Sequence, residues 1–178
     1  MKSLTVWTIG HSNKSIGELV RALEANRIEL VADVRRFPGS RRLPQFTKPA
    51  LEHALAAHHI AYCWIEQLGG RRRPSPTSPN VAWRNEGFRG YADYLATEDF
   101  AQGLFELLML ANGLRTVVMC AEVLWWRCHR RLIADVLVSL GISVIHIRDE
   151  TATDAHRLIA PARLVRGQLT YRAPRTLM

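Results

Sequence analysis

The chain has few of the features that mark secreted, membrane-spanning or disulfide-stabilised proteins. Its 178 residues include three cysteines, Cys63, Cys120 and Cys128, and no two of them form a C-x-x-C pair. An odd number of widely spaced cysteines argues against a disulfide framework and fits a reducing compartment. No apolar run approaches the roughly 20 residues that cross a bilayer, and no apolar signal-peptide core follows Met1. We therefore expect a cytoplasmic protein without a membrane partner.

Lysine is also scarce, and the positive charge of the chain comes almost entirely from arginine. Of the 24 Lys and Arg residues 21 are arginine, the formal net charge is +8, and the pI is about 10.1. Arginine presents a planar fork of donors that suits phosphate and carboxylate groups. The excess indicates an anionic partner, either a small molecule or nucleic acid, although arginine-rich codon usage would give the same composition.

Alternating strand and helix patterns predict a three-layer α/β fold with a mainly parallel five-stranded sheet and helices on both faces. A hydrophobic content of 48% is enough for a sizeable core. The expected strands are residues 5–9, 29–34, 61–65, 116–119 and 143–147, and the expected helices are 16–26, one from about 47, 91–96, 98–112 and 124–140.

Two segments fall outside this alternation. Residues 68–90 contain Gly69-Gly70, three consecutive arginines and three prolines, so we expect a flexible loop there. Residues 163–171 predict a small C-terminal hairpin that turns at Arg166-Gly167. The chain as a whole, residues 1–178, is expected to form a single domain.

Polar and titratable residues follow every predicted strand, at the edge where parallel α/β sheets bind ligands. Turns that serve only the fold do not require histidine, aspartate, cysteine and glutamate together, so this edge is the predicted site. The residues that we expect to contact a ligand there are His11, Ser12, Asp33, Arg35, Gly69, Gly70, Tyr91 and Arg130.

Three side chains between the fourth strand and the following helix are candidates for chemistry. Cys120 lies at the strand-to-helix turn and is the candidate nucleophile, with Glu122 and His129 as candidate acid or base groups. Structural interpretations stay open, because a free cysteine is usually a buried small hydrophobe and His129 can be a core histidine bonded to Glu122 or a carbonyl. The segment lacks the glycine-rich cradle of phosphatase and rhodanese loops, which argues against those activities.

The predicted helix at 124–140 orients several of these residues. Helical phase places His129 inward, together with Leu132, Ile133, Val136, Leu137 and Leu140. It leaves Arg127 and Arg131 facing solvent.

Other residues at this edge also have two interpretations. Asp33 can orient an arginine, accept a ligand hydroxyl or cap its own turn, and Tyr91 and Tyr94 can stack on a base or pack within a helix. The spacing of Cys120, Cys128 and His129 matches no standard zinc motif, so no metal is expected, and the sequence indicates no cofactor.

Six motifs occur in order along the chain and are followed by His146. They are Thr8-Ile9-Gly10-His11-Ser12, Asp33-Val34-Arg35 with Pro38 and Ser40, Leu68-Gly69-Gly70, Tyr91-Ala92-Asp93-Tyr94, Cys120-Ala121-Glu122 and Cys128-His129-Arg130. With these motifs the chain, from about Thr5 to Tyr171, closely resembles the bacterial family known as domain of unknown function 488. The resemblance implies a single α/β domain and one grouped site, without implying a reaction. The turn from Val123 to Trp126 departs from the family pattern, which is polar there and has a helix-starting proline.

Three functions are consistent with the sequence. The first is an enzyme or enzyme-like domain that holds an anionic, nucleotide-like ligand through Arg35 and Arg130. The second is a nucleic-acid-binding module that uses the arginine-rich surface, including Arg71-Arg72-Arg73. The third is a sensor that binds a small anion without turnover.

Overall fold

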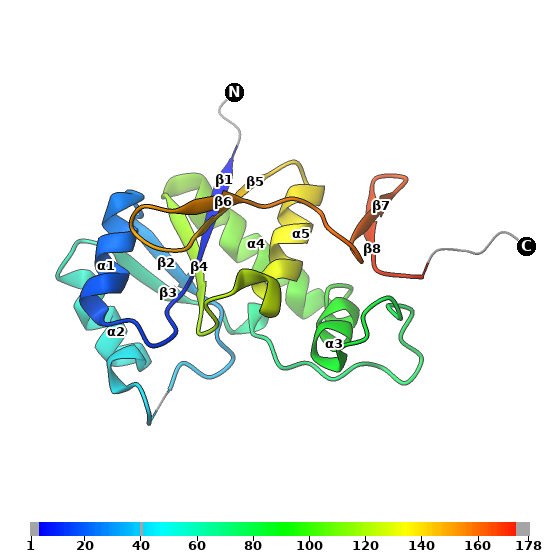
Figure 1. Ribbon diagram of the computed structural model, residues 1–178, viewed down its shortest axis with the longest axis horizontal. Coiled ribbons are helices and arrows are strands. Elements are labelled where there is room, and N and C mark those ends of the chain that lie inside the picture. Colours follow the sequence, from blue (N-terminus) through cyan, green and yellow to red (C-terminus); the bar gives the residue numbers. More distant parts are fainter. Residues whose placement is uncertain (1–3, 40, 174–178) are drawn as a thin grey trace, which may run out of the picture.

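A six-stranded sheet lies between two layers of helices in the computed structural model, which describes residues 4–39 and 41–173 (Figure 1). The strand order is β3-β2-β4-β1-β5-β6. The motif residue Ser40 lies outside the described residues. Five strands are parallel, β1 (Thr5–Gly10), β2 (Leu30–Asp33), β3 (Ala61–Trp64), β4 (Thr116–Cys120) and β5 (Ser143–Ile147), and β6 (Thr153–Ala155) is antiparallel to β5.

This architecture confirms the predicted α/β fold, with one strand more than expected. The sequence of β6 is Thr-Asp-Ala, which is too short and too polar to resemble a strand. It forms because β5 would otherwise be an open edge, and pairing with β6 satisfies its backbone groups.

The helices divide between the two faces of the sheet. The helices α1 and α2, at the left in Figure 1, pack on one face of the sheet, and α4 and α5 pack on the other face. None of the helices in the described residues is long and apolar enough to span a bilayer. The bounds are α1 (Ile16–Ala25), α2 (Lys48–Ala56), α3 (Glu86–Tyr94), α4 (Glu98–Gly113) and α5 (Arg130–Ser139), with single 3₁₀ turns η1 (Pro44–Phe46), η2 (Glu66–Leu68) and η3 (Trp125–Arg127).

Side-chain alternation along the strands gives the fold two hydrophobic cores. In β1, Trp7 and Ile9 pack with α1 and α2, whereas Val6 joins the core under α4 and α5. Thr8 points to the same face as Val6, and it is 2% exposed. The α5 face of the sheet therefore carries a buried hydroxyl in its centre.

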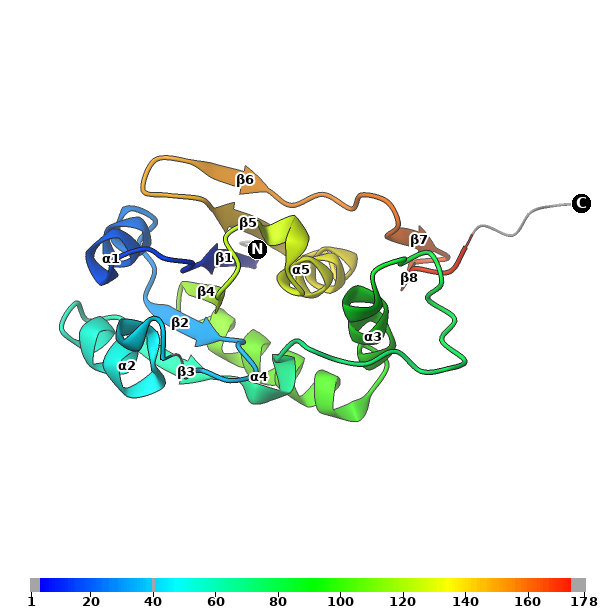
Figure 2. The same cartoon turned by 60° about the horizontal axis from the view of Figure 1, so that its bottom comes forward.

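The strand order creates a switch point between β1 and β4. These two strands are neighbours, yet β1 continues into α1 on one face and β4 leads to α5 on the other. Figure 2 shows the two connections leaving in different directions. Diverging connections leave a crevice at the carboxyl ends of such strands. The residues that end β1 and β4, namely Gly10 and Cys120, lie opposite each other there.

The helix after β4 begins later than predicted. Residues 125–127 form a 3₁₀ turn, Cys128 is extended with φ −122 and ψ 151, and α5 begins at Arg130. The expectation of one helix over residues 124–140 is therefore wrong, because the extended Cys128 interrupts helical hydrogen bonding. Leu140, predicted to face inward, is 57% exposed just after the end of the helix.

Arg131 was predicted to face solvent but is buried. It is 8% exposed, its guanidinium lies 4.8 Å from the ring centroid of Trp83, and its Nη2 donates to the carbonyls of Ile159 and Ala160. The sequence did not indicate this contact because both partners belong to distant segments of the chain.

The C-terminal hairpin has the predicted position and turn. Strands β7 (Arg163–Val165) and β8 (Gln168–Thr170) pair around Arg166 and Gly167, whose φ values are +53 and +78. Two consecutive positive φ angles are typical of the tight turn that matches strand twist. The predicted 68–90 loop is shorter than expected, because α3 already begins at Glu86.

A capping box at the start of α1 gives a stability prediction. The Ser15 hydroxyl accepts from the Glu18 amide, and the Glu18 carboxylate accepts from the Ser15 amide. Replacing Ser15 with alanine should lower the free energy of unfolding by about 1 kcal/mol, measured by urea denaturation. Ser143→Ala, at an exposed strand start, is the control and should change the free energy of unfolding much less. Equal losses in both variants would contradict the role of the cap.

Candidate functional site

A cavity of about 480 Å³ opens at the β1–β4 switch point, where the sequence predicted the site. Its floor contains Cys120 and Cys128, and His129 and Gly70 lie beside them. Its lining includes the candidates Arg35, Gly70, Cys120, Glu122 and His129 together with Arg36, Phe37, Gly39, Arg71, Asn85, Gly87, Phe88, Ala121, Arg127 and Cys128.

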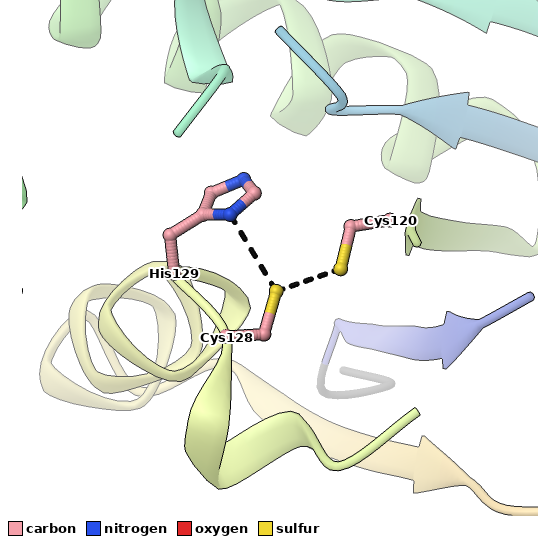
Figure 3. Close-up of side chains that lie close together, drawn as sticks. All are labelled: Cys120, Cys128 and His129. Atoms are coloured by element: carbon pink, nitrogen blue, oxygen red, sulfur yellow. Dashed lines mark hydrogen bonds between the residues drawn. The ribbon is translucent and has the colours of Figure 1, made fainter. Parts of the chain in front are cut away.

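Two of the residues that line this cavity carry thiols that lie next to each other (Figure 3). The Sγ atoms of Cys120, at the end of β4, and Cys128, just before α5, are 2.6 Å apart. Both side chains are buried, and both cysteines are free. The guanidinium Nε of Arg130 donates to the Cys120 Sγ at 3.1 Å, so a cation lies directly behind the sulfur pair.

His129 lies on the other side of Cys128, as Figure 3 shows, with its Nδ1 3.5 Å from the Cys128 Sγ. The Nε2 of the same ring is 3.1 Å from the carbonyl oxygen of Val34. Because a carbonyl oxygen only accepts, Nε2 carries a proton, and the neutral ring presents an unprotonated Nδ1 to Cys128. His129 is therefore oriented to accept the proton of the Cys128 thiol.

The ring of His129 needs a glycine at position 70. A Cβ atom on Gly70 would lie 2.8 Å from the His129 Nδ1, closer than any side chain tolerates. Tyr91 contacts the ring from another side, with ring centroids 5.1 Å apart. Gly70, which the sequence predicted at this site, therefore leaves the space that the His129 imidazole occupies.

The two thiols differ in their electrostatics. Burial, the hydrogen bond with Cys128 and the charge on Cys128 raise the pKa of Cys120 well above its usual value. Burial also acts to raise the pKa of Cys128, but the Cys120 hydrogen bond, the adjacent imidazole of His129 and the guanidinium of Arg130 lower it well below its usual value. Both directions favour Cys128 over Cys120 as the sulfur that carries a negative charge.

Arg130 is the buried cation that balances this charge. It is 1% exposed, and its Nη2 donates to the carbonyl of Glu122 at 2.5 Å. Burial acts to lower the pKa of Arg130, but the charges of Cys120 and Cys128 raise it above its ordinary value. The turn that carries the Glu122 carbonyl lies against Gly10, where a Cβ atom would be 1.9 Å from that oxygen.

A chain of hydrogen bonds runs from Arg130 through the α5 face of the sheet. The Arg130 Nη1 donates to the Thr8 hydroxyl at 3.1 Å, and that hydroxyl lies 2.7 Å from the Nδ1 of His146. The Nε2 of His146 lies 2.9 Å from the Nδ1 of His156, whose Nε2 lies 2.8 Å from the carboxylate of Asp135. Each member of the chain is buried.

With both histidines in the neutral form, the two ends of this chain set the direction of its bonds. The Asp135 carboxylate accepts from His156 and from the Tyr171 hydroxyl, so His156 accepts at Nδ1 and His146 donates from Nε2. The chain therefore begins on a cation and ends on an anion. The ring of Trp125 stacks on His146 with centroids 4.2 Å apart, which places this tryptophan over the chain and outside the cavity lining.

A buried ion pair between Arg35 and Asp33 lies beside the cavity. The Arg35 guanidinium binds the Asp33 carboxylate, with Nη2 at 2.5 Å from Oδ2, and its Nη1 donates to the carbonyl of Phe46. The Nη1 also lies 3.3 Å from the Nε2 of His11, which stacks on Phe46. Asp33 thus orients an arginine, one of the roles that the sequence left open. Arg35 lines the cavity, and its positive charge is paired with the carboxylate of Asp33.

The remaining predicted residues lie around the site and outside the cavity lining. His11 is buried, and Ser12 beside it has φ +44 and donates its amide to the Ala121 carbonyl. Tyr91 is 1% exposed and donates its hydroxyl to the Leu68 carbonyl, so it packs in the core. Gly69 is also buried.

Sequence reasoning missed the side chains at the mouth of the cavity. Arg36, Arg71 and Arg127 line it, and Phe37, which is 66% exposed, stands among them. The available signal was position, because Arg36 directly follows Arg35, and Arg71 directly follows Gly70. Glu122 is the one carboxylate among the lining residues that the structure describes.

The three side chains Cys120, Cys128 and His129 have the atom types of a metal site, with ligand atoms within 4.8 Å of one another. Their arrangement does not suit a cation. Two sulfurs bound to one zinc at about 2.3 Å in tetrahedral geometry lie much farther apart than the observed 2.6 Å, and the guanidinium of Arg130 already occupies one side of Cys120. The geometry favours thiol chemistry.

A comparison with protein-family models gives one match. Residues 15–137 match the family described as Domain of unknown function DUF488. No significant match was found among curated proteins or among solved structures. The matched region includes both thiols, His129, Arg130, Asp33 and Arg35, and it stops before His146 and the hairpin.

The buried neutral histidines predict that the protein loses stability in acid. Burial lowers the pKa of His11 to about 4 and that of His146 to about 3, from 6.5. Between pH 6.5 and about 4 the unfolded chain therefore binds more protons than the folded chain, and the free energy of unfolding falls as the pH falls. From pH 7 to pH 5 we expect each histidine to contribute a loss of about 1–2 kcal/mol, measured by urea denaturation.

A matched pair of histidine variants tests this cause. His146→Asn should lower the stability at pH 7 but weaken its dependence on pH. The exposed His53 of α2 provides the control, and His53→Asn should keep the pH dependence of the wild-type protein. An unchanged pH slope in His146→Asn would contradict the assignment.

Proposed function

The chain belongs to the DUF488 family, and we propose that it is an enzyme, or an enzyme-like domain, that binds an anionic, nucleotide-like ligand in the switch-point cavity. The observation that carries this proposal is the pairing of Cys128 with the unprotonated Nδ1 of His129 at the floor of a cavity with an arginine-rich mouth. A thiolate beside an oriented imidazole is the arrangement used for nucleophilic catalysis.

In this proposal Cys128 is the nucleophile, in the role that the sequence suggested for Cys120. His129 accepts the thiol proton and returns it to the leaving group, because its Nδ1 faces the sulfur and its Nε2 is held by Val34. Cys120 and Arg130 stabilise the thiolate from behind. Glu122 at the rim can activate water or orient a ligand hydroxyl.

The chemistry of the mouth supports an anionic ligand that carries a ring. Arg36, Arg71 and Arg127 face a shared space in which Glu122 is the one acid among the described residues. Phe37 and Phe88 add aromatic surface to the same walls, which suits stacking on a base. The volume of about 480 Å³ lies within the range of small-ligand pockets.

Nucleic acid remains the second candidate, because its phosphates would meet the same arginines. The Arg71-Arg72-Arg73 run does not form one continuous surface, since Arg72 lies 3.7 Å over the ring of Tyr94 and donates to the Gly69 carbonyl. Binding to nucleic acid through phosphates should weaken steeply as the salt concentration rises. A small-anion sensor would share the binding and lack turnover.

Thiol labelling tests the nucleophile. With iodoacetamide at pH 7, wild-type protein should carry one fast-reacting thiol, and Cys128→Ser should abolish it. Cys120→Ser should keep a fast thiol, slower than in wild type because one hydrogen bond to Cys128 is lost. Cys63→Ser is the control, since burial raises the pKa of Cys63 to about 11 and its thiol reacts slowly. Loss of the fast thiol in Cys120→Ser alone would return the nucleophile to Cys120.

Ligand binding tests the mouth of the cavity. Adenosine monophosphate, followed by calorimetry at low salt, should bind to the reduced protein, and Arg127→Ala should weaken the affinity by about tenfold, which corresponds to about 1.4 kcal/mol. The exposed Arg157, which lies outside the cavity lining, provides the control variant Arg157→Ala with unchanged affinity. Equal weakening in both variants would indicate a general charge effect.

A further inference from the structure

We propose that Cys128 and Cys120 form a dithiol–disulfide couple, in which Cys128 attacks a hydroperoxide and Cys120 resolves the product. This two-electron reduction goes beyond ligand binding, and it shares with the proposed function only the identity of the attacking thiol.

The position of the two sulfurs carries the proposal. Their separation of 2.6 Å exceeds a disulfide bond of about 2.05 Å by roughly half an ångström, so small side-chain rotations can close the bond. The third cysteine, Cys63, lies in β3 and donates to Glu106, so it has its own partner away from the pair. Of the three free cysteines, the fold therefore brings Cys120 and Cys128 together and keeps Cys63 apart from them.

Access and charge assign different roles to the two sulfurs. Both line the cavity floor, so a small oxidant can reach them. His129 lies against Cys128 and Arg130 donates to Cys120, so Cys128 has the base that a nucleophile requires. Cys120 keeps its proton, which the second step consumes as part of a water molecule.

The two steps balance in atoms and electrons. The Cys128 thiolate attacks the distal oxygen of ROOH, the O–O bond breaks, and RO⁻ takes the proton that His129 received from Cys128, which yields a sulfenic acid and ROH. The Cys120 sulfur then attacks the Cys128 sulfur, the S–O bond breaks, and the hydroxyl leaves as water with the Cys120 proton. Two thiols are oxidised and one hydroperoxide is reduced. A small dithiol returns the disulfide to two thiols.

The buried cation makes this disulfide easy to reduce. Arg130 is 1% exposed, and among its side-chain partners in the described residues the sulfur pair is the one that can carry a negative charge. Forming the disulfide removes that charge and leaves the guanidinium buried with neutral acceptors. Environments that stabilise the thiolate favour the reduced state. The couple is therefore suited to a catalytic cycle and poorly suited to a permanent cross-link.

The test uses reduced, full-length protein and one equivalent of hydrogen peroxide. We expect the count of titratable thiols to fall from three to one, with the intact mass lower by two hydrogen atoms and a Cys120–Cys128 linked peptide after digestion. Dithiothreitol should restore all three thiols. Cys63→Ser should form the same disulfide, because Cys63 takes no part.

Variants assign the two roles. Cys120→Ser should accumulate a sulfenic acid on Cys128 that dimedone traps, and Cys128→Ser should resist the same dose of peroxide. Overoxidation of Cys128 at equal rates in wild type and Cys120→Ser would overturn the proposal. So would stoichiometric zinc that protects both thiols until a chelator removes it. If Cys120→Ser fails to fold, the linked peptide from wild type decides the question.

Nucleotide binding is measured on the same reduced samples. Disulfide formation without binding would contradict the ligand proposed for the cavity and leave the couple intact. Binding without disulfide formation would overturn the couple alone.

Discussion

The structure of this site depends on one buried positive charge. A guanidinium does not lose its proton inside a protein, and a buried charge destabilises the fold unless it is paired. Arg130 is 1% exposed, and none of its hydrogen-bond partners in the described residues is a carboxylate. The fold instead gives it the sulfur pair on one side and a chain of neutral dipoles on the other. The position of Arg130 therefore favours a thiolate in the sulfur pair.

The chain of dipoles connects the site to the C-terminal hairpin. It runs from Arg130 through Thr8, His146 and His156 to Asp135, and the hydroxyl of Tyr171 completes the shell of that carboxylate. With neutral histidines, the two ends of the chain favour one direction for its hydrogen bonds. Through Tyr171 and His156, the hairpin and the edge strand β6 therefore contribute to the electrostatics of the site. The cation at one end and the anion at the other end favour the same orientation of every dipole between them.

The sequence was a good guide to what local patterns determine and a poor guide to what distant contacts determine. The five parallel strands, the Ser15 cap, the hairpin turn and the edge at which Cys120, Glu122 and His129 gather were all predictable, since periodicity and turn chemistry are local. The start of α5, the burial of Arg131 and the strand β6 were not predictable. Arg131 is buried by partners that are remote in the chain, the carbonyls of residues 159 and 160. The strand β6 pairs with the nearby β5 but is too short and too polar to be recognised, and α5 starts late because Cys128 is extended. Apolar composition at 123–126 suggested an uninterrupted helix, whereas Trp125 serves to cover His146.

The choice between the two thiols illustrates the same limit. In the sequence, Cys120 has the better position, because it ends a strand and precedes a turn, while Cys128 resembles an ordinary helical residue. In three dimensions the single cation Arg130 can support one thiolate, and a second negative charge 2.6 Å from the first would be strongly repelled. The asymmetry then comes from His129, which contacts Cys128 and is fixed by Val34 and Gly70. A carbonyl and a glycine that lie 95 and 59 residues earlier in the chain than His129 thus favour Cys128 over Cys120 as the charged sulfur.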